Sequence, residues 1–186
     1  PAISSSASIV IKPSEKTPLS AIKIVEILIK NGLPPDMVKI ITGKNASNIL
    51  SKILSYDYMD MLTFTGGLSV GLKIQKKMLE HGHSLKRYVP ELGGCSSLIV
   101  CSDANLDRAV DIVLNGCFKN SGQRCTSIRR VIVDQSVVEQ YIDKLMTRVK
   151  AIVYGNPLNE NVDMGTVIDE ESAIRIENRI KSAISA

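Results

Sequence analysis

The sequence predicts an α/β protein, and three observations predict it. Short apolar runs with β-branched residues alternate with longer segments that carry apolar residues at helical spacing. Glycine, proline, asparagine and aspartate separate these segments. The chain has 186 residues, of which 44% are hydrophobic, and that is enough to bury a sizeable core. Strands that alternate with helices at this spacing indicate βαβ crossovers, and therefore a parallel sheet covered on both faces.

The first half predicts three strand–helix units and a fourth strand. The strands fall at 7–12, 36–42, 59–67 and 85–94, and the helical segments at 14–32, 45–57 and 68–82. Pro13 ends the first strand. Pro18 suits a first helical turn, Gly32 suits a C-cap, and Asn45 or Ser47 suits an N-cap. This half is a candidate nucleotide-binding domain with a Rossmann-like parallel sheet.

The pattern restarts after Gly93 and Gly94, which predict the seam between a cofactor domain (1–92) and the start of an α/β catalytic domain (93–186). Strands are predicted at 96–103 and 127–134, and helices at 105–120, 136–155 and from 170 onward. Asp103 or Asn105 is the expected N-cap of the helix at 105–120. The last helical pattern runs to the end without a cap, so we expect an internal piece of a longer chain.

Composition argues against several classes of function. The net charge of +4 is small and has no block of like charges, so no nucleic-acid partner is predicted. The apolar runs are shorter than the roughly 20 residues of a membrane helix, so no membrane partner is predicted. No export signal is visible at the start.

Cysteines and histidines limit the chemistry further. Cys95, Cys101, Cys117 and Cys125 have irregular spacing and no CxxC pair, which predicts no metal site, no disulfide framework and a reducing, cytoplasmic location. The only histidines, His81 and His83, are expected to be solvated loop or helix-end residues, so a base must be of another kind. Packing is expected for every cysteine except Cys125. That residue, in "NSGQRCTSIRR", is either a buried thiol or a nucleophile.

Four short stretches occur in a characteristic order: "KPSEKTP" at 12–18, "TFTGG" at 63–67, "ELGG" at 91–94 and "GQRC" at 122–125. In this order and spacing they resemble the aldehyde dehydrogenase superfamily over essentially the whole chain. With "KNSGQRCTSIRR" and "GTVIDE", the resemblance is nearest to phosphonoacetaldehyde dehydrogenases. It implies NAD-dependent oxidation of an aldehyde to its carboxylate through a cysteine thiohemiacetal and thioester, by an enzyme that is a homo-oligomer at full length.

The resemblance assigns catalytic roles to two residues. Cys125 is the expected nucleophile, and Glu91 is the expected base, which takes a proton from the thiol or from the water that attacks the thioester. The alternative for Glu91 is a surface carboxylate that ends a strand. Arg124 and Thr126 flank the thiol and are expected to contact the substrate. The backbone N–H of Cys125 is one expected oxyanion donor, and the family's second donor, an asparagine, lies outside this sequence.

The cofactor site is expected without the GxGxxG fingerprint. Thr65, Gly66 and Gly67 come after a strand and at a helix start, where backbone N–H groups favour a pyrophosphate. The alternative is a simple glycine turn. The resemblance assigns Lys12 and Glu15 to the adenosine ribose, and a carboxylate there predicts NAD over NADP; the alternative is a solvated loop. The other cofactor-binding residues that we expect are Ser14, Gly43, Leu92 and Gly93.

The expected substrate is a small, anionic aldehyde that carries a phosphonate. Arg124, with Lys119, Arg129 and Arg130 nearby in sequence, offers charge-assisted contacts to such an anion. Because consecutive strand residues point to opposite faces, at most one of Arg129 and Arg130 is expected to face the pocket. Other small anionic semialdehydes are the next candidate substrates. Two alternatives from other classes are a non-catalytic nucleotide-binding relative and an inactive structural fragment.

Overall fold

A computed structural model describes residues 2–185. The chain forms two compact units. One contains the residues up to Thr63 together with Leu72–Val89, and the other contains Phe64–Gly71 together with the residues from Pro90 onward. The division at Val89 and Pro90 lies near the predicted seam. The functional limits 1–92 and 93–186 stay a prediction.

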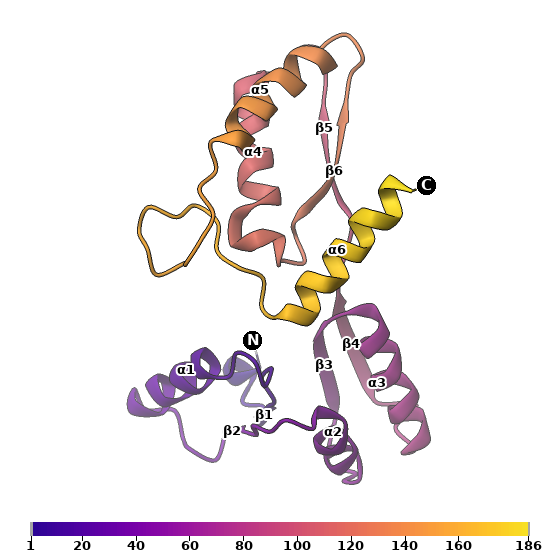
Figure 1. Ribbon diagram of the computed structural model, residues 1–186. Helices are drawn as coiled ribbons and strands as arrows, with labels where there is room; N and C mark the ends of the chain where they lie inside the picture. The colour runs from indigo at the N-terminus through magenta and orange to yellow at the C-terminus, as the bar shows by residue number, and fades with distance from the viewer. Residues whose placement is uncertain (1, 186) are drawn as a thin grey trace. The chain divides into compact units, whose positions relative to one another are not determined.

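The predicted order of strands and helices is confirmed (Figure 1). In chain order the elements are η1 (Ile3–Ser5), β1 (Ile9–Ile11), α1 (Leu19–Lys30), β2 (Val38–Ile40), α2 (Ala46–Leu54), β3 (Met61–Gly66), α3 (Leu68–Glu80), β4 (Arg87–Leu92), β5 (Ser96–Val100), α4 (Leu106–Cys117), η2 (Lys119–Gly122), β6 (Ile128–Val133), α5 (Val138–Lys150) and α6 (Glu170–Ile184). The two 3-10 turns, η1 and η2, were not predicted. Helix α5 also ends at Lys150, five residues before the predicted limit.

Local hydrogen bonds explain where the helices begin and end. The side chain of Asn45 accepts from the backbone N–H of Asn48 at 3.0 Å, and Asn105 does the same for Arg108 at 3.0 Å. Each of these bonds satisfies an N–H that has no partner within its own helix. Gly32 follows α1 with φ of +97°, a conformation that glycine adopts at little cost.

The strands pair two by two. Strands β1 and β2 are parallel, β5 and β6 are parallel, and β3 pairs with β4. The α/β class and the parallel pairing of β1–β2 and β5–β6 are therefore confirmed. Cover on both faces is not found for β5–β6, because Ile99 and Ile132, which are register partners, remain 68% and 53% exposed. Helices α4 and α5 pack on the other face.

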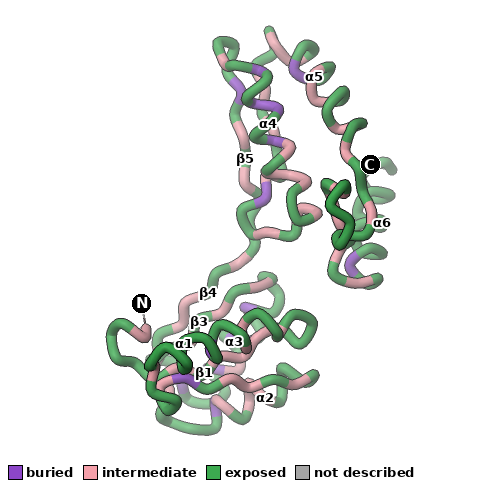
Figure 2. The backbone as a smooth tube through the Cα atoms, turned by 90° about the vertical axis from the view of Figure 1, so that its left-hand side faces the viewer, coloured by how far each residue is buried: buried purple, intermediate pink, exposed green. Residues whose placement is uncertain are grey.

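The core of the second unit is made mostly by α4 (Figure 2). Its buried residues are Leu106, Ala109, Val110 and Val113, at the spacing of one helical face. They pack against Val100 of β5 and Tyr141 of α5. Burial of such a side chain contributes about 1.5–3 kcal/mol, so this cluster fixes α4 and α5 on the β5–β6 pair.

The first unit has a smaller core, and it includes a histidine. Val25, Val38 and Leu54 are buried there. His83 is also buried, and its Nε2 lies 2.7 Å from the backbone carbonyl oxygen of Leu54 at the end of α2. The prediction of a solvated residue is therefore wrong for His83, because its ring satisfies a helix-terminal carbonyl. His81 is exposed, as predicted.

No helix among residues 2–185 combines the length and the apolarity that crossing a membrane would require.

Candidate active site

Strands β5 and β6 bring two of the predicted motifs to one edge of their sheet (Figure 1). Ser96 is the register partner of Ile128, at the first residue of each strand. The ELGG stretch runs into β5 and the GQRC stretch runs into β6. Because parallel strands begin at the same edge, both stretches lie at the amino edge of this pair.

A close approach of backbones supports this placement. A Cβ atom on Gly94 would lie 4.0 Å from the carbonyl oxygen of Cys125, and that carbonyl is the nearest group to it. The end of ELGG therefore lies beside the turn that carries Cys125. Glu91 is exposed near the end of β4, Leu92 is partly buried and Gly93 is exposed. Glu91, Leu92, Gly93 and Cys125 all belong to the second unit.

Cys125 occupies an exposed turn. The backbone N–H of Ser127 donates to the carbonyl of Arg124 at 3.2 Å, which closes a four-residue turn with Cys125 and Thr126 at its centre. Both central residues are exposed. Ser127 is buried, and its hydroxyl donates to the carbonyl of Gly122 at 2.9 Å. The interpretation of Cys125 as a buried thiol is wrong, because the turn holds it outside the core.

Arg124 anchors this turn to α4. Its guanidinium donates to the carbonyl oxygen of Asn115 at 2.6 Å, in the last turn of the helix. A cation is favourable there because the terminal carbonyls have no partner within the helix and carry partial negative charge. The structure therefore gives Arg124 a partner in the protein, and its predicted contact with substrate stays a prediction.

The backbone before the cysteine is strained. Asn120, Ser121 and Gly122 have φ values of 58°, 55° and 68°, so three consecutive residues are left-handed. This conformation costs roughly 1–2 kcal/mol for a residue with a Cβ atom. A Cβ on Gly122 would also lie 2.8 Å from the carbonyl oxygen of Cys117. Strain of this kind clusters at functional sites, where the surrounding structure enforces it.

A β-bulge alters the expected alternation of the two arginines. Ser96 pairs with Ile128, but Ser97 pairs with Arg130, so Arg129 has no partner in the ladder. Arg129 and Arg130 are both exposed. The rule that neighbours on a strand point to opposite faces does not apply across this bulge, because the extra residue breaks the pleat.

The residues expected at the ribose lie at the carboxyl edge of β1 and β2. Lys12 donates to the carbonyl of Pro13 at 2.8 Å and lies 3.5 Å from the carboxylate of Glu15. A hydrogen bond from its own backbone N–H, with a further contribution from Lys12, lowers the pKa of Glu15 below its usual value. Ser14 is exposed, and its hydroxyl accepts from the backbone N–H of Lys16 at 3.2 Å.

Gly43 shares that edge, because it follows β2 and β2 is parallel to β1. A Cβ on Gly43 would lie 2.8 Å from the side chain of Ile49 in α2. Glycine therefore lets the chain pass close to α2 at this edge. A nucleotide binds at the carboxyl ends of parallel strands in this class of fold. The position of Lys12, Glu15 and Gly43 at this edge therefore fits a nucleotide site.

Thr65, Gly66 and Gly67 form the junction between β3 and α3, and they cluster with the second unit. The carbonyl of Gly67 accepts from the N–H of Gly71 at 3.0 Å, so the helix begins here. A Cβ on Gly66 would lie 2.5 Å from the ring of Phe64. Thr65 and Gly67 are exposed at the start of a 13-residue helix, an arrangement that fits an anionic group.

Comparison with known proteins decides the family. The model of the aldehyde dehydrogenase family matches residues 1–186. The chain belongs to the aldehyde dehydrogenase family. This confirms the resemblance at the level of the family, but the finer closeness to phosphonoacetaldehyde dehydrogenases is not shown.

Individual relatives match almost the whole chain. The 3-sulfolactaldehyde dehydrogenase of Priestia aryabhattai is 34% identical over 99% of this chain and 37% of its own length. The lactaldehyde dehydrogenase of Methanococcus maripaludis is 36% identical over 100% of this chain and 39% of its own length. The chain therefore spans less than two fifths of the length of these relatives.

Similar solved structures have the same fold. An NADP-dependent enzyme from E. coli superimposes with a TM-score of 0.88 at 30% identity, over 96% of this chain and 36% of the other. An NAD-dependent aldehyde dehydrogenase from Sinorhizobium meliloti superimposes with a TM-score of 0.87 at 30% identity. The match covers 98% of this chain and 37% of the other. The α/β class is thus confirmed by comparison as well as by the strand pairing.

The sequence did not indicate that two side chains tie the loop before Cys125 to a remote segment. The side chains of Ser121 and Gln123 hydrogen-bond to the backbone of the segment 165–168. No local pattern signals such a contact, because the partners are more than 40 residues away along the chain.

The remaining cysteines only partly follow the prediction that they pack. Cys95 and Cys101 are exposed, so the prediction is wrong for them; each lies just outside β5, where the chain leaves the sheet. Cys117 packs against the core of the second unit, and its thiol donates to the carbonyl of Ile128 at 3.2 Å. Burial raises the pKa of the Cys117 thiol, which keeps it protonated and unreactive.

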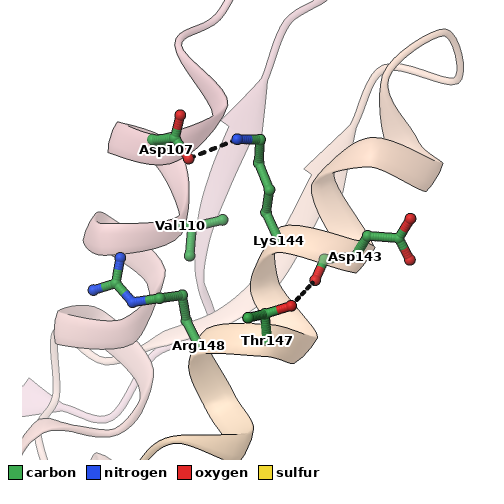
Figure 3. Close-up of a pocket in the computed structure, with 6 residues that line it drawn as sticks. All are labelled: Asp107, Val110, Asp143, Lys144, Thr147 and Arg148. Carbon is green, nitrogen blue, oxygen red and sulfur yellow. Dashed lines mark hydrogen bonds and ion pairs between the residues drawn. The ribbon is translucent and has the colours of Figure 1, made fainter.

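A separate groove of about 310 Å³ lies between α4 and α5 (Figure 3). Its lining residues are Asp107, Val110, Asp143, Lys144, Thr147 and Arg148. Lys144 reaches across it to Asp107, with 2.7 Å between Nζ and Oδ1. Neither Cys125 nor Glu91 lines this groove, so it is distinct from the candidate active site.

Replacement of Gly122 by alanine tests the strained loop. We expect Gly122→Ala to lower the free energy of unfolding by about 2 kcal/mol, because alanine disfavours a positive φ and its Cβ meets the Cys117 carbonyl. Urea denaturation measures the change. The matched control is Gly93→Ala, where a Cβ has open space and the expected change is within about 0.5 kcal/mol. Equal effects at the two positions would contradict the strain.

Proposed function

We propose that the protein is an NAD-dependent aldehyde dehydrogenase in which Cys125 is the nucleophile and Glu91 is the base. One observation carries the proposal: Cys125 is exposed on a turn that lies beside the end of the ELGG stretch. Membership of the family supports the same assignment. The alternatives, a nucleotide-binding relative without turnover and an inactive structural fragment, predict no chemistry at this thiol.

The chemistry needs a group that turns a trigonal aldehyde carbonyl into a tetrahedral centre. The Cys125 sulfur forms a bond to the carbonyl carbon and yields a thiohemiacetal, and the backbone N–H of Cys125 stabilises the oxyanion. NAD⁺, when bound, accepts the hydride that this centre expels. The product on the chain is then a thioester at Cys125, which water cleaves to the carboxylate.

Glu91 acts as the base in this scheme. A carboxylate takes a proton from the thiol before attack, or from the water that cleaves the thioester. The position of Glu91 near the end of β4 supports this role, because the stretch that follows it runs beside the turn with Cys125. Both residues belong to one compact unit, so their relative placement does not depend on the other unit.

The proposed cofactor is NAD rather than NADP. Lys12, Ser14, Glu15 and Gly43 are proposed to hold the ribose end. For Thr65, Gly66, Gly67, Leu92 and Gly93, which belong to the other unit, the expected cofactor role stays a prediction. A glutamate carboxylate is charged at neutral pH, and the direction of the pKa shift of Glu15 agrees with this; the charged group accepts from ribose hydroxyls and repels a 2′-phosphate. Similar structures include an NADP-dependent enzyme and an NAD-dependent one. The shared fold therefore does not determine the cofactor, and we assign the preference for NAD to the side chain of Glu15.

The proposed substrate is a small anionic aldehyde, with phosphonoacetaldehyde as the leading candidate. A relative is named for 3-sulfolactaldehyde, whose sulfonate is likewise an anion at the end of a short chain. Thr126 is exposed beside the thiol, and Arg129 and Arg130 are exposed after it. Together with Arg124, the two arginines Arg129 and Arg130 offer charge-assisted contacts to such an anion. We also propose a homo-oligomer for the full-length enzyme and a cytoplasmic location.

Removal of the nucleophile is the decisive experiment. We expect Cys125→Ala to lower turnover of phosphonoacetaldehyde by more than about 1,000-fold, while the thermal shift produced by NAD⁺ is kept. NADH absorbance measures turnover. Propanal, an uncharged aldehyde, is the substrate with which phosphonoacetaldehyde is compared. Cys101→Ala, at a second exposed thiol, is the control and is expected to retain wild-type turnover. Wild-type turnover in Cys125→Ala would reject the assignment.

Glu91 has its own signature. In Glu91→Gln we expect the step after hydride transfer to slow by roughly 100-fold, because the amide cannot deprotonate the attacking water. Stopped-flow measurement should show a burst of about one NADH per site and then a slow steady state. The matched control is Glu160→Gln, at an exposed carboxylate. Steady-state turnover like that of the control would exclude Glu91 as the base.

The Glu15 carboxylate should set the cofactor preference. We expect Glu15→Gln to shift the ratio of kcat/KM for NAD⁺ over NADP⁺ by about tenfold toward NADP⁺, which corresponds to about 1.4 kcal/mol. Steady-state kinetics with each cofactor measure the ratio. Glu26→Gln, on the exposed side of α1, is the control. An unchanged ratio in Glu15→Gln would remove this residue from the site.

A further inference from the structure

The loop that precedes Cys125 is tied to a remote segment of the chain by two side chains. Gln123 Oε1 accepts from the backbone N–H of Ile168 at 2.7 Å. Ser121 Oγ donates to the carbonyl of Gly165 at 2.8 Å. The segment 165–168 lies between α5 and α6 and belongs to the same compact unit as the loop.

The amide of Gln123 is used at both of its ends. While Oε1 accepts from Ile168, Nε2 donates to the carbonyl of Asn120 at 3.2 Å and to the carbonyl of Thr166 at 3.4 Å. A carboxylate has no donor for the two carbonyls, and an apolar side chain has neither donor nor acceptor. This set of partners therefore fits an amide.

The far end of the tether is itself held in place. Tyr154 and Met164 form an isolated β-bridge, and Gly165 packs close to Pro157, with 3.1 Å between its ideal Cβ position and the Pro157 Cβ. On the other side, Asp169 caps α6 by accepting from the N–H of Ser172 at 2.8 Å. The segment is thus fixed at both ends and provides an anchor for the loop.

The loop requires such an anchor because its conformation is unfavourable by itself. Asn120 and Ser121 are left-handed and carry Cβ atoms, and such residues persist only where surrounding contacts enforce them. Gln123 and Ser121 supply these contacts from within the loop. Cys125 follows Gln123 by two residues, so relaxation of the loop would move the thiol.

We propose that Gln123 is the positioning residue of the Cys125 nucleophile, with Ser121 as its second tether. The proposal rests on the proposed role of Cys125. Gln123 touches neither substrate nor thiol in this scheme; it fixes the turn that carries the sulfur. Displacement of a nucleophile by about 1 Å costs on the order of 100-fold in rate, so loss of the tether should appear in kcat.

The test compares Gln123→Met with a matched control. Methionine keeps the length of the side chain and removes all three hydrogen bonds. We expect kcat with phosphonoacetaldehyde and NAD⁺ to fall between about 10-fold and 100-fold, with KM changed by less than about 2-fold. Amide hydrogen exchange at Ile168 should accelerate, since its acceptor is gone. Gln135→Met, at an exposed turn residue, should leave kcat, KM and exchange at Ile168 unchanged.

A second variant keeps the test decisive if Gln123→Met does not fold. Ser121→Gly removes the hydroxyl tether, and glycine adopts the observed φ without strain. We expect a smaller fall in kcat, about 3-fold to 10-fold, again at constant KM. An unchanged kcat in the folded variants, or a rise in KM at constant kcat, would overturn the positioning role.

The two proposals fail in different ways. Wild-type turnover in Cys125→Ala would reject the proposed function itself. Loss of turnover in Cys125→Ala together with wild-type kcat in Gln123→Met would reject the positioning role alone.

Discussion

The parallel pairing of β5 with β6 is the constraint on which the candidate active site depends. It aligns Ser96 with Ile128, and so it brings the two connections that enter these strands to one edge. One connection carries the end of ELGG and the other carries Cys125, and a Cβ on Gly94 would lie 4.0 Å from the carbonyl oxygen of Cys125. The buried face of α4 then holds the pair in place through Val110 and Val100. Two stretches that are far apart in sequence thereby become neighbours at this edge.

Patterns that are local in sequence predicted most of the fold. Helix and strand order followed from periodicity, and the caps at Asn45 and Asn105 followed from the preference of a side-chain amide oxygen for free N–H groups. The parallel arrangement followed from the alternation of strands and helices, since consecutive parallel strands need a crossover. The sequence left Cys125 as either a buried thiol or a nucleophile, and the structure excludes the buried thiol because Cys125 is exposed.

Features that depend on distant partners were beyond such patterns. His83 is buried because its ring meets the last carbonyl of α2, which lies 29 residues earlier. Cys95 and Cys101 lie beside apolar runs but outside β5, so neighbouring hydrophobic residues gave them no burial. The bulge at Arg129 depends on how β6 meets β5, and a single strand carries no signal of it. Periodicity describes one element at a time, whereas these features arise between elements.

The strained loop explains why Cys125 needs more support than the edge of the sheet provides. Strand pairing fixes the chain only from Ile128 onward, and the turn with Cys125 lies before that point. Three other contacts complete the support: Arg124 to the end of α4, Gln123 to the segment 165–168, and Ser127 back to Gly122. The first two lead to other parts of the chain, α4 and the segment 165–168, and the third closes the loop on itself. An exposed thiol can therefore keep a defined position although little of its side chain is buried, because its backbone is held from several directions.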